Sequence, residues 1–244
     1  MLLVSLIDVS GVGAQRPSRS PSKLGFVFDL DGTLIDSVYQ HVLAWQEALE
    51  QAGIELSAWR IHRRVGMSGG LFVNALRREI GHPFDAEEAA RMQQTHSEAY
   101  LRRIDQIRAL PGAKELLATL TQAGVPWAIA TSGRRRSAGH ALKILQLDPE
   151  TPLITRDDVE RAKPDPDLFI AAADRLGVKV RHCMVVGDSV WDLLAARRAG
   201  ALGVGVLSGG YGEDELIRAG AYRVYSDPAD LLAHLDECGV RQGI

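Results

Sequence analysis

Two aspartates at the end of an apolar run are the first residues of this chain whose spacing suits chemistry. Asp29 and Asp31 lie at the end of the run Gly25–Leu30 and are followed by Gly32. If this run is a strand, both carboxylates can turn toward one edge of a sheet as it ends, and glycine allows the sharp turn that follows. Two carboxylates this close repel each other unless a cation or a proton lies between them. The pair therefore indicates a metal site or acid–base chemistry.

Further polar residues follow later apolar runs in a definite order. Thr131 ends the run Val125–Thr131, Lys163 begins the segment Lys-Pro-Asp-Pro, and residues 187–192 read Gly-Asp-Ser-Val-Trp-Asp. Together with residues 29–34 (Asp-Leu-Asp-Gly-Thr-Leu), these segments resemble the four motifs of the haloacid dehalogenase-like hydrolase superfamily. The resemblance covers all but the N-terminal tail and points to the helical-cap members, which include phosphoglycolate phosphatase and β-phosphoglucomutase.

The resemblance implies a phosphatase in which an aspartate is the nucleophile. Asp29 would attack phosphorus and form an aspartyl-phosphate, while Asp31 would protonate the leaving oxygen and then activate water. Mg²⁺ would be held by Asp29, Asp188 and the backbone carbonyl of Asp31, because this hard cation prefers oxygen ligands. Lys163 would add a fixed positive charge, and the hydroxyl of Thr131 would bind phosphate oxygens.

Neighbouring residues are expected to complete the site. Ser132 and the turn at Gly32 are expected to bind phosphate or substrate, and Ser189 to donate a hydrogen bond nearby. Asp192 follows Asp188 by four residues and shares its face if a helix begins there. We therefore expect Asp192 to orient the residues that bind the metal rather than to bind the metal itself.

Basic residues elsewhere are candidates for substrate contacts. In residues 62–70, two arginines and a histidine precede a Gly/Ser turn, and we expect Arg64 and His62 to contact the remote part of the substrate. Residues 134–136 are three arginines at a predicted helix start, where the helix dipole disfavours positive charge. This favours a ligand or partner role for one of the three, while the others are expected to be solvated. The loop 208–212 is expected to be mobile and able to line the site.

The elements that must position these residues alternate between strands and helices. The apolar runs have the composition of strands buried on both faces, and the helical segments between them begin at Pro or Asp and end at Gly. Strands are expected at 25–30, 125–131, 183–187, 201–207 and 221–225, and helices at 111–123, 165–177 and 227–239. This alternation predicts an α/β fold with a doubly wound, mainly parallel sheet of Rossmann-like type.

Residues 37–109 interrupt the alternation and contain no convincing strand. Ser37 can cap a first helix, and Asp85 with Glu88 forms a capping-box-like start to a later one. An all-α insert at this point is expected to form a cap domain over the carboxyl edge of the sheet, where open α/β sheets bind ligands. The predicted division is a disordered tail at residues 1–22, a catalytic core at 23–36 and 110–244, and a cap at 37–109.

The composition excludes several other classes of protein. The 244 residues carry a net charge of −3, which argues against a broad basic surface for nucleic acid or anionic lipid. No stretch approaches the roughly 20 apolar residues of a membrane span, and the N-terminus lacks the pattern of a secretory signal. Cys183 and Cys238 are expected to be free thiols. A cytoplasmic enzyme acting on a small phosphorylated metabolite is predicted, while nothing in the sequence sets the oligomeric state.

Alternative functions are distinguished by single positions. Dehalogenases of this superfamily lack the second aspartate, here Asp31, and phosphonate-cleaving members use a cap lysine, which residues 37–109 do not contain. Sugar-phosphate mutases similar to β-phosphoglucomutase keep both aspartates but usually show Glu-Asp where this chain has Gly187 and Asp188, so a phosphatase is favoured. A non-catalytic regulator that binds phospho-ligands would gain nothing from keeping both Asp29 and Asp31.

Overall fold

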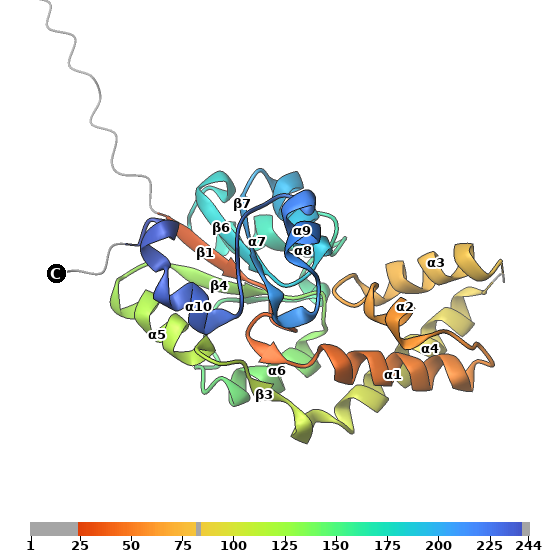
Figure 1. The fold of residues 1–244 in the computed structure, drawn as a ribbon. Coiled ribbons are helices and arrows are strands. Elements are labelled where there is room, and N and C mark those ends of the chain that lie inside the picture. The colour runs from red at the N-terminus through yellow and green to blue at the C-terminus, as the bar shows by residue number, and fades with distance from the viewer. Residues whose placement is uncertain (1–23, 82–83, 241–244) are drawn as a thin grey trace, which may run out of the picture.

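The computed structural model describes residues 24–81 and 84–240, so the tail predicted to be disordered at residues 1–22 lies outside the described residues (Figure 1). Its centre is a six-stranded sheet in the order β5-β4-β1-β6-β7-β8, with every neighbouring pair parallel. The strands are β1 Gly25–Phe28, β4 Trp127–Ala130, β5 Leu153–Ile154, β6 Cys183–Gly187, β7 Leu202–Val206 and β8 Ala221–Tyr225. The strand order reverses at β1, which therefore has the ends of β4 and β6 on either side. Such a switch point is where open α/β sheets bind ligands.

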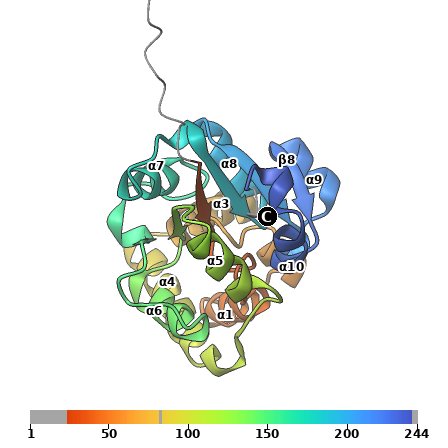
Figure 2. The same cartoon turned by 90° about the vertical axis from the view of Figure 1, so that its left-hand side faces the viewer.

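Helices cover both faces of this sheet, as the alternating pattern predicted (Figures 1 and 2). Phe26 and Phe28 point into one apolar cluster with α5, α6 and α10, whereas Val27 points into the opposite cluster with α7 and α8. The helices of the core are α5 Ala113–Gln122, α6 Arg135–Ile144, α7 Asp167–Arg175, α8 Val190–Ala199, α9 Glu213–Ala219 and α10 Pro228–Ala233. Short 3₁₀ turns are η1 Ile104–Gln106, η2 Arg156–Asp158, η3 Val180–His182, η4 Leu207–Gly209 and η5 Leu235–Cys238. Both cysteines are buried and free, as predicted.

A separate group of helices lies beside the carboxyl edge of the sheet (Figure 1). It comprises α1 Val38–Gln51, α2 Ala58–His62, α3 Gly69–Ile80 and α4 Ala86–Leu101. These helices share an apolar cluster of their own, in which Trp45, Phe72 and Leu76 are buried. The capping box predicted for α4 is present, with Asp85 and Glu88 each bonded to the other's backbone N–H. An all-α cap is thus inserted into the α/β core. Among the helices of the described residues, none has the length and apolar character needed to cross a bilayer.

Three local expectations are corrected by the structure. Residues 37–109 do contain a strand, because β3 (Arg108–Ala109) pairs antiparallel with β2 (Ile35–Asp36) where the chain passes between cap and core. Strands of two residues show no periodicity, and β5 was missed for the same reason. Ser37 precedes α1, but its hydroxyl makes no capping bond. It donates instead to Asp31 at 2.6 Å.

Candidate active site

The polar residues predicted at the strand ends are brought together by the sheet register. Phe28 of β1 pairs with Ile129 of β4 and with Val186 of β6, so the residues just beyond these strands share one edge. Asp29, Thr131 and Asp188 lie there, and each is at most 4% exposed. Because β1, β4 and β6 are parallel neighbours in the sheet, these side chains lie together although the residues are far apart in the sequence.

Lys163 is the cation of this group and is completely buried. It reaches the site from the segment before α7 and forms ion pairs with Asp29 and, at 2.8 Å, with Asp192. Burial by itself lowers the pKa of Lys163, but the two carboxylates outweigh this effect and raise it above the usual value. Lys163 is therefore charged, and it bridges the first and fourth motifs.

One lysine does not balance the carboxylates that surround it. Oxygen atoms of Asp29, Asp188 and Asp192 all lie within 4.8 Å of one another, and all three residues are buried. Burial, together with Asp192 and Asp31, raises the pKa of Asp29 to about 7 against the opposing effect of Lys163. Burial and the neighbouring carboxylates likewise raise the pKa of Asp188 well above its usual value. An excess of negative charge on oxygen-only donors fits a hard divalent cation such as Mg²⁺.

The supports of this acidic cluster come from three loops. Thr33 donates to Asp188 at 3.1 Å, and the hydroxyl of Ser189 donates to Asp192 at 2.5 Å. Ser189 therefore orients Asp192 rather than facing the phosphate site. Gly209 lies so close to Asp188 that a side chain there would overlap the carboxylate. Its neighbour Ser208 donates to the carbonyl of Gly32 at 2.6 Å, so this part of the loop 208–212 packs under the site instead of lining the cavity.

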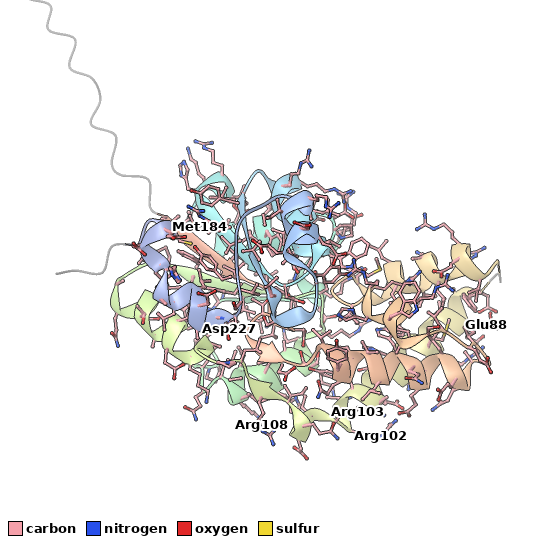
Figure 3. The ribbon with its side chains drawn as sticks, in the orientation of Figure 1. Glu88, Arg102, Arg103, Arg108, Met184 and Asp227 are labelled. Carbon is pink, nitrogen blue, oxygen red and sulfur yellow. The ribbon has the colours of Figure 1, made fainter. Side chains whose placement is uncertain are left out.

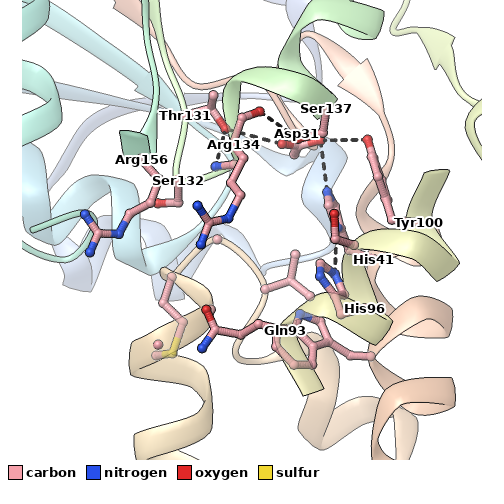
Figure 4. Close-up of a pocket in the computed structure, with 18 of the residues that line it drawn as sticks. Asp31, His41, Gln93, His96, Tyr100, Thr131, Ser132, Arg134, Ser137 and Arg156 are labelled. Atoms are coloured by element: carbon pink, nitrogen blue, oxygen red, sulfur yellow. Dashed lines mark hydrogen bonds and ion pairs between the residues drawn. The ribbon is translucent and has the colours of Figure 1, made fainter. Parts of the chain in front are cut away.

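Asp31 has different surroundings from Asp29, although only one residue separates them (Figure 4). Its Oδ1 accepts hydrogen bonds from Ser37 at 2.6 Å and Tyr100 at 3.4 Å and lies 3.2 Å from Nε2 of His41. Its Oδ2 accepts from Thr131 at 3.4 Å. Burial alone would raise the pKa of Asp31, but His41 and the other partners outweigh it and hold the pKa at about 2. Asp31 is therefore ionised in this arrangement.

Sequence reasoning missed the cap residues that surround Asp31. Ser37 and His41 come from the start of α1, and Tyr100 comes from the end of α4. His41 stacks on Tyr100 with ring centroids 3.9 Å apart, and its Nδ1 lies 3.2 Å from Nε2 of His96. Burial lowers the pKa of His96 well below the usual value, so its imidazole is neutral. The spacing of His96 and Tyr100, four residues apart on one helix face, was the available signal.

A cavity of about 530 Å³ lies between the core and the cap. At its core side the hydroxyl of Ser132 is buried without a hydrogen-bond partner among the described residues, which suits an oxygen-rich ligand. The backbone N–H of Gly133 donates to the hydroxyl of Thr131 at 2.9 Å. The lining residues are Asp29, Asp31, His41, Trp45, Val65, Gly66, Met67, Gly69, Gly70, Gln93, His96, Ser97, Tyr100, Thr131, Ser132, Gly133, Arg134, Ser137, Arg156 and Asp157.

The predicted substrate contacts of the cap lie elsewhere. Arg64 forms an ion pair with Glu79 of α3 and donates to the carbonyl of Arg60, and it does not line the cavity. His62 also lies outside the lining, with Nε2 2.8 Å from the carbonyl oxygen of Gly209 in the core. Both side chains are occupied by packing within the cap or between cap and core. From the arginine run, Arg134 does reach the cavity.

Known proteins share both this motif order and this fold. The model of the family described as haloacid dehalogenase-like hydrolase matches residues 24–200. Hexitol phosphatase A of Escherichia coli (strain K12) is 37% identical over 180 residues, covering 72% of this chain and 79% of that protein. A phosphoglycolate phosphatase of Caulobacter vibrioides is 34% identical over 197 residues, covering 80% of this chain and 83% of that protein.

Solved structures agree with the sequence comparisons. The crystal structure of a hydrolase from Pseudomonas syringae has a TM-score of 0.87 and 56% identity, covering 88% of this chain and 99% of that one. A β-phosphoglucomutase from Clostridium difficile has a TM-score of 0.75 at 23% identity, covering 90% of this chain and all of that one, and this likeness shows the fold alone. The family match, the sequence relatives and the motif-bearing strand ends lead to one conclusion: this chain belongs to the haloacid dehalogenase-like hydrolases.

Proposed function

We propose that this chain is an Mg²⁺-dependent phosphomonoester hydrolase that cleaves a small phosphorylated metabolite through an aspartyl-phosphate. The observation that carries the proposal is the placement of Asp29, which lines the cavity, is paired with Lys163 and shares an oxygen cluster with Asp188. A nucleophile, a fixed cation and a set of oxygen donors thus face one enclosed space. Phosphate monoesters hydrolyse extremely slowly on their own, and these are the groups that their cleavage requires.

The free thiols favour a reducing compartment such as the cytoplasm.

Each group has a defined task in this proposal. Asp29 and Asp188, with the backbone carbonyl of Asp31, would hold Mg²⁺, and the ion would supply positive charge against the phosphate dianion. Lys163 orients Asp29 and opposes the rise of its pKa on burial, and Asp192 keeps Lys163 in place. The hydroxyls of Thr131 and Ser132 would donate to phosphate oxygens. Asp192 belongs to the same oxygen cluster, so it stands close enough to be a direct ligand as well.

Asp31 is proposed to transfer the proton. Its lowered pKa makes it ionised in this arrangement, so it must gain a proton before it can protonate the leaving oxygen. His41, 3.2 Å away, is placed to share one with it. Once the alcohol has left, the same carboxylate can accept a proton from the water that attacks the aspartyl-phosphate. Contact with three cap residues means that this acid–base group is complete only when the cap lies over the core.

The cap residues argue against the mutase alternative. A sugar-phosphate mutase must hold a bisphosphate, whose second phosphate needs cations far from the nucleophile. Among the described residues of 37–109, no lysine or arginine lines the cavity. The apolar cluster shared by α1 to α4 supports a cap at 37–109 beside a core at 23–36 and 110–244, although four buried residues of this segment, Ala44, Ala99, Tyr100 and Ile107, pack into the cluster of the core. A purely regulatory binder is disfavoured by the presence of both the nucleophile and the proton-transfer group.

The direct test is hydrolysis of p-nitrophenyl phosphate with Mg²⁺ and with chelator. Wild type should turn over only with the metal. Asp29→Asn should lose more than about 10³-fold of kcat while keeping its fold, because the amide is nearly isosteric but a poor nucleophile. Mass spectrometry of acid-quenched wild type should show phosphate on Asp29. Activity of Asp29→Asn near that of wild type would rule out the aspartyl-phosphate.

A further inference from the structure

We infer that the alcohol released by this enzyme is uncharged and polyhydroxylated, of the polyol or sugar type, rather than a carboxylated alcohol. This inference rests on the proposed phosphatase function and adds the class of substrate to it. The observations behind it concern the side of the cavity that the cap forms, opposite Asp29 of the core. That side must contact whatever is attached to the phosphate.

In the part of the cap that the structure describes, no lysine, arginine, aspartate or glutamate lines the cavity. The arginines of the cap that could have faced inward are held elsewhere by partners. Arg60 and Arg64 pair with Glu79, and Arg63 pairs with Glu215 of the core. Arg102 and Arg103 follow α4, where the chain returns toward the core, and pair with Glu47 (Figure 3). A carboxylate on the remote end of a substrate would find no charged partner on this side.

Neutral hydrogen-bonding groups take the place of charges there. Gln93, His96, Ser97 and Tyr100 follow helical spacing on α4 and form one polar stripe along the cavity (Figure 4). The amide of Gln93 makes one long bond, from Nε2 to the carbonyl of Ala89 at 3.3 Å, and leaves its oxygen available. Within the described part of the chain, the hydroxyl of Ser97 has no hydrogen bond. Amides and hydroxyls donate and accept at once, as substrate hydroxyls do.

Apolar groups beside this stripe give the cavity a second kind of surface. Trp45 lines it and is fixed between Phe72 and His96, with ring centroids 4.0 Å and 4.2 Å away. Met67 lies on the same side, and at Gly70 even an added Cβ would meet nothing within 4 Å. Apolar side chains beside open space suit the C–H groups of a hydroxylated carbon chain.

The charges at the cavity rim come from the core and are already engaged. Arg134 pairs with Asp157 at 3.0 Å, and Arg156 donates to the carbonyls of Val159 and Glu160 at 2.7 and 3.0 Å. A substrate carboxylate would have to compete with these partners. On the cap side it would lose its hydration without an ion pair, which is strongly unfavourable. Substrate hydroxyls meet no such penalty, because the stripe on α4 satisfies them.

The test compares three phosphate monoesters under identical conditions with Mg²⁺: glucitol 6-phosphate, phosphoglycolate and p-nitrophenyl phosphate. We expect kcat/KM for the hexitol phosphate to exceed that for phosphoglycolate by about tenfold or more, the value of one or two neutral hydrogen bonds. Equal or better use of phosphoglycolate overturns the inference and leaves the phosphatase function intact. Failure to hydrolyse any of the three, with Asp29→Asn indistinguishable from wild type, defeats the proposed function instead.

Variants of α4 test whether the residues of this helix determine which alcohol the enzyme accepts. Gln93→Leu should lower the ratio of kcat/KM for glucitol 6-phosphate over p-nitrophenyl phosphate by roughly three- to tenfold. Gln94→Leu is the matched control, because Gln94 is exposed and pairs with Glu98 outside the cavity, and its ratio should equal that of wild type. Ser97→Lys should raise the relative use of phosphoglycolate by giving its carboxylate a partner. An unchanged ratio in both cavity variants would overturn the assignment of the cap side to the alcohol.

Discussion

Nε2 of His41, in the cap, lies 3.2 Å from Oδ1 of Asp31, in the core. The contact joins the proposed proton-transfer group to the part of the molecule that covers the substrate. His41 is itself held by His96 and by stacking on Tyr100, so its ring has one orientation. Through this contact, His41 is the chief influence that lowers the pKa of Asp31 against the effect of burial.

Removing this imidazole should impair proton transfer more than phosphate binding. His41→Ala should reduce kcat for an alkyl phosphate by about 10²-fold, in the range typical of general acid–base catalysis. The loss on p-nitrophenyl phosphate should be smaller, since its leaving group needs less protonation. Steady-state kinetics on both substrates measure the difference, with His140→Gln on α6 as the matched control. Equal losses on the two substrates would show that His41 acts only in holding the cap.

The metal-free protein should lose stability as pH rises through the neutral range. The pKa of Asp29 is about 7 in the folded chain and about 3.8 in the unfolded chain. Between these two pH values, the folded chain therefore binds a proton that the unfolded chain has released. The contribution of Asp29 to the free energy of unfolding is therefore at its maximum below about pH 4, and it falls as pH rises toward 7. One pKa unit corresponds to about 1.4 kcal/mol. Denaturation at pH 5.5 and pH 8 in chelator should show the fall.

The same experiment has two internal controls. Asp29→Asn removes one titrating group and should reduce the pH dependence to the part that comes from Asp188, whose pKa is also raised. Saturating Mg²⁺ should restore stability at pH 8 because it replaces the protons among the carboxylates. Titration of Asp31 does not affect the measurement between pH 5.5 and pH 8. The pKa of Asp31 is lowered to about 2, so its contribution to the free energy of unfolding is lost only as pH falls below about 4. A wild-type stability that rises with pH in chelator, to the same extent as in Asp29→Asn, would contradict the prediction.

Gly209 should be required for metal binding although it is not a ligand. A Cβ at this position would overlap the carboxylate of Asp188, so Gly209→Ala must move that carboxylate. We expect Mg²⁺ affinity to fall by about 10- to 100-fold, as for other supports of metal ligands. Gly212→Ala is the matched control, because its φ is −76° and the nearest atom would lie 3.5 Å from the added Cβ. Calorimetric titration with Mg²⁺ would show equal affinities for the two variants if this explanation were wrong.

The ion pair between Arg63 and Glu215 should contribute little to cap closure. It joins the end of α2 to α9, since Arg63 directly follows α2, but both side chains are more than a third exposed, and water screens such pairs. Glu215→Ala should therefore change KM by less than about fivefold. The guanidinium also lies 4.1 Å from the ring centroid of Tyr211, whose hydroxyl donates to the carbonyl of Arg63 at 2.9 Å. We expect Tyr211→Ala to raise KM more than Glu215→Ala does, and the reverse order would count against this view.

The sequence was most informative where local patterns determine position. Asp29, Thr131 and Asp188 end apolar runs, and parallel strands in one sheet must bring such ends together. The partners of Asp31 were not predictable in this way, because His41 and Tyr100 reach it only through the packing of α1 against α4. Arg64 shows the opposite error: its spacing suggested a ligand, but the side chain finds Glu79 once α2 lies beside α3. Partner choice on a helix surface depends on neighbours that the sequence does not place.

The antiparallel pairing of β2 with β3 has a mechanical consequence. Gly32 donates from its backbone N–H to the carbonyl of Ile35 at 2.8 Å, and Ile35 opens the ribbon that carries the chain into the cap. The loop bearing Asp29, the proposed nucleophile, and the crossing into the cap are therefore one short piece of backbone, with only three residues between Asp31 and Ile35. Any rotation of the cap would act on the backbone next to Asp31, because the two crossings are hydrogen-bonded to each other. In the proposed reaction, proton transfer by Asp31 would therefore be coupled to the position of the cap.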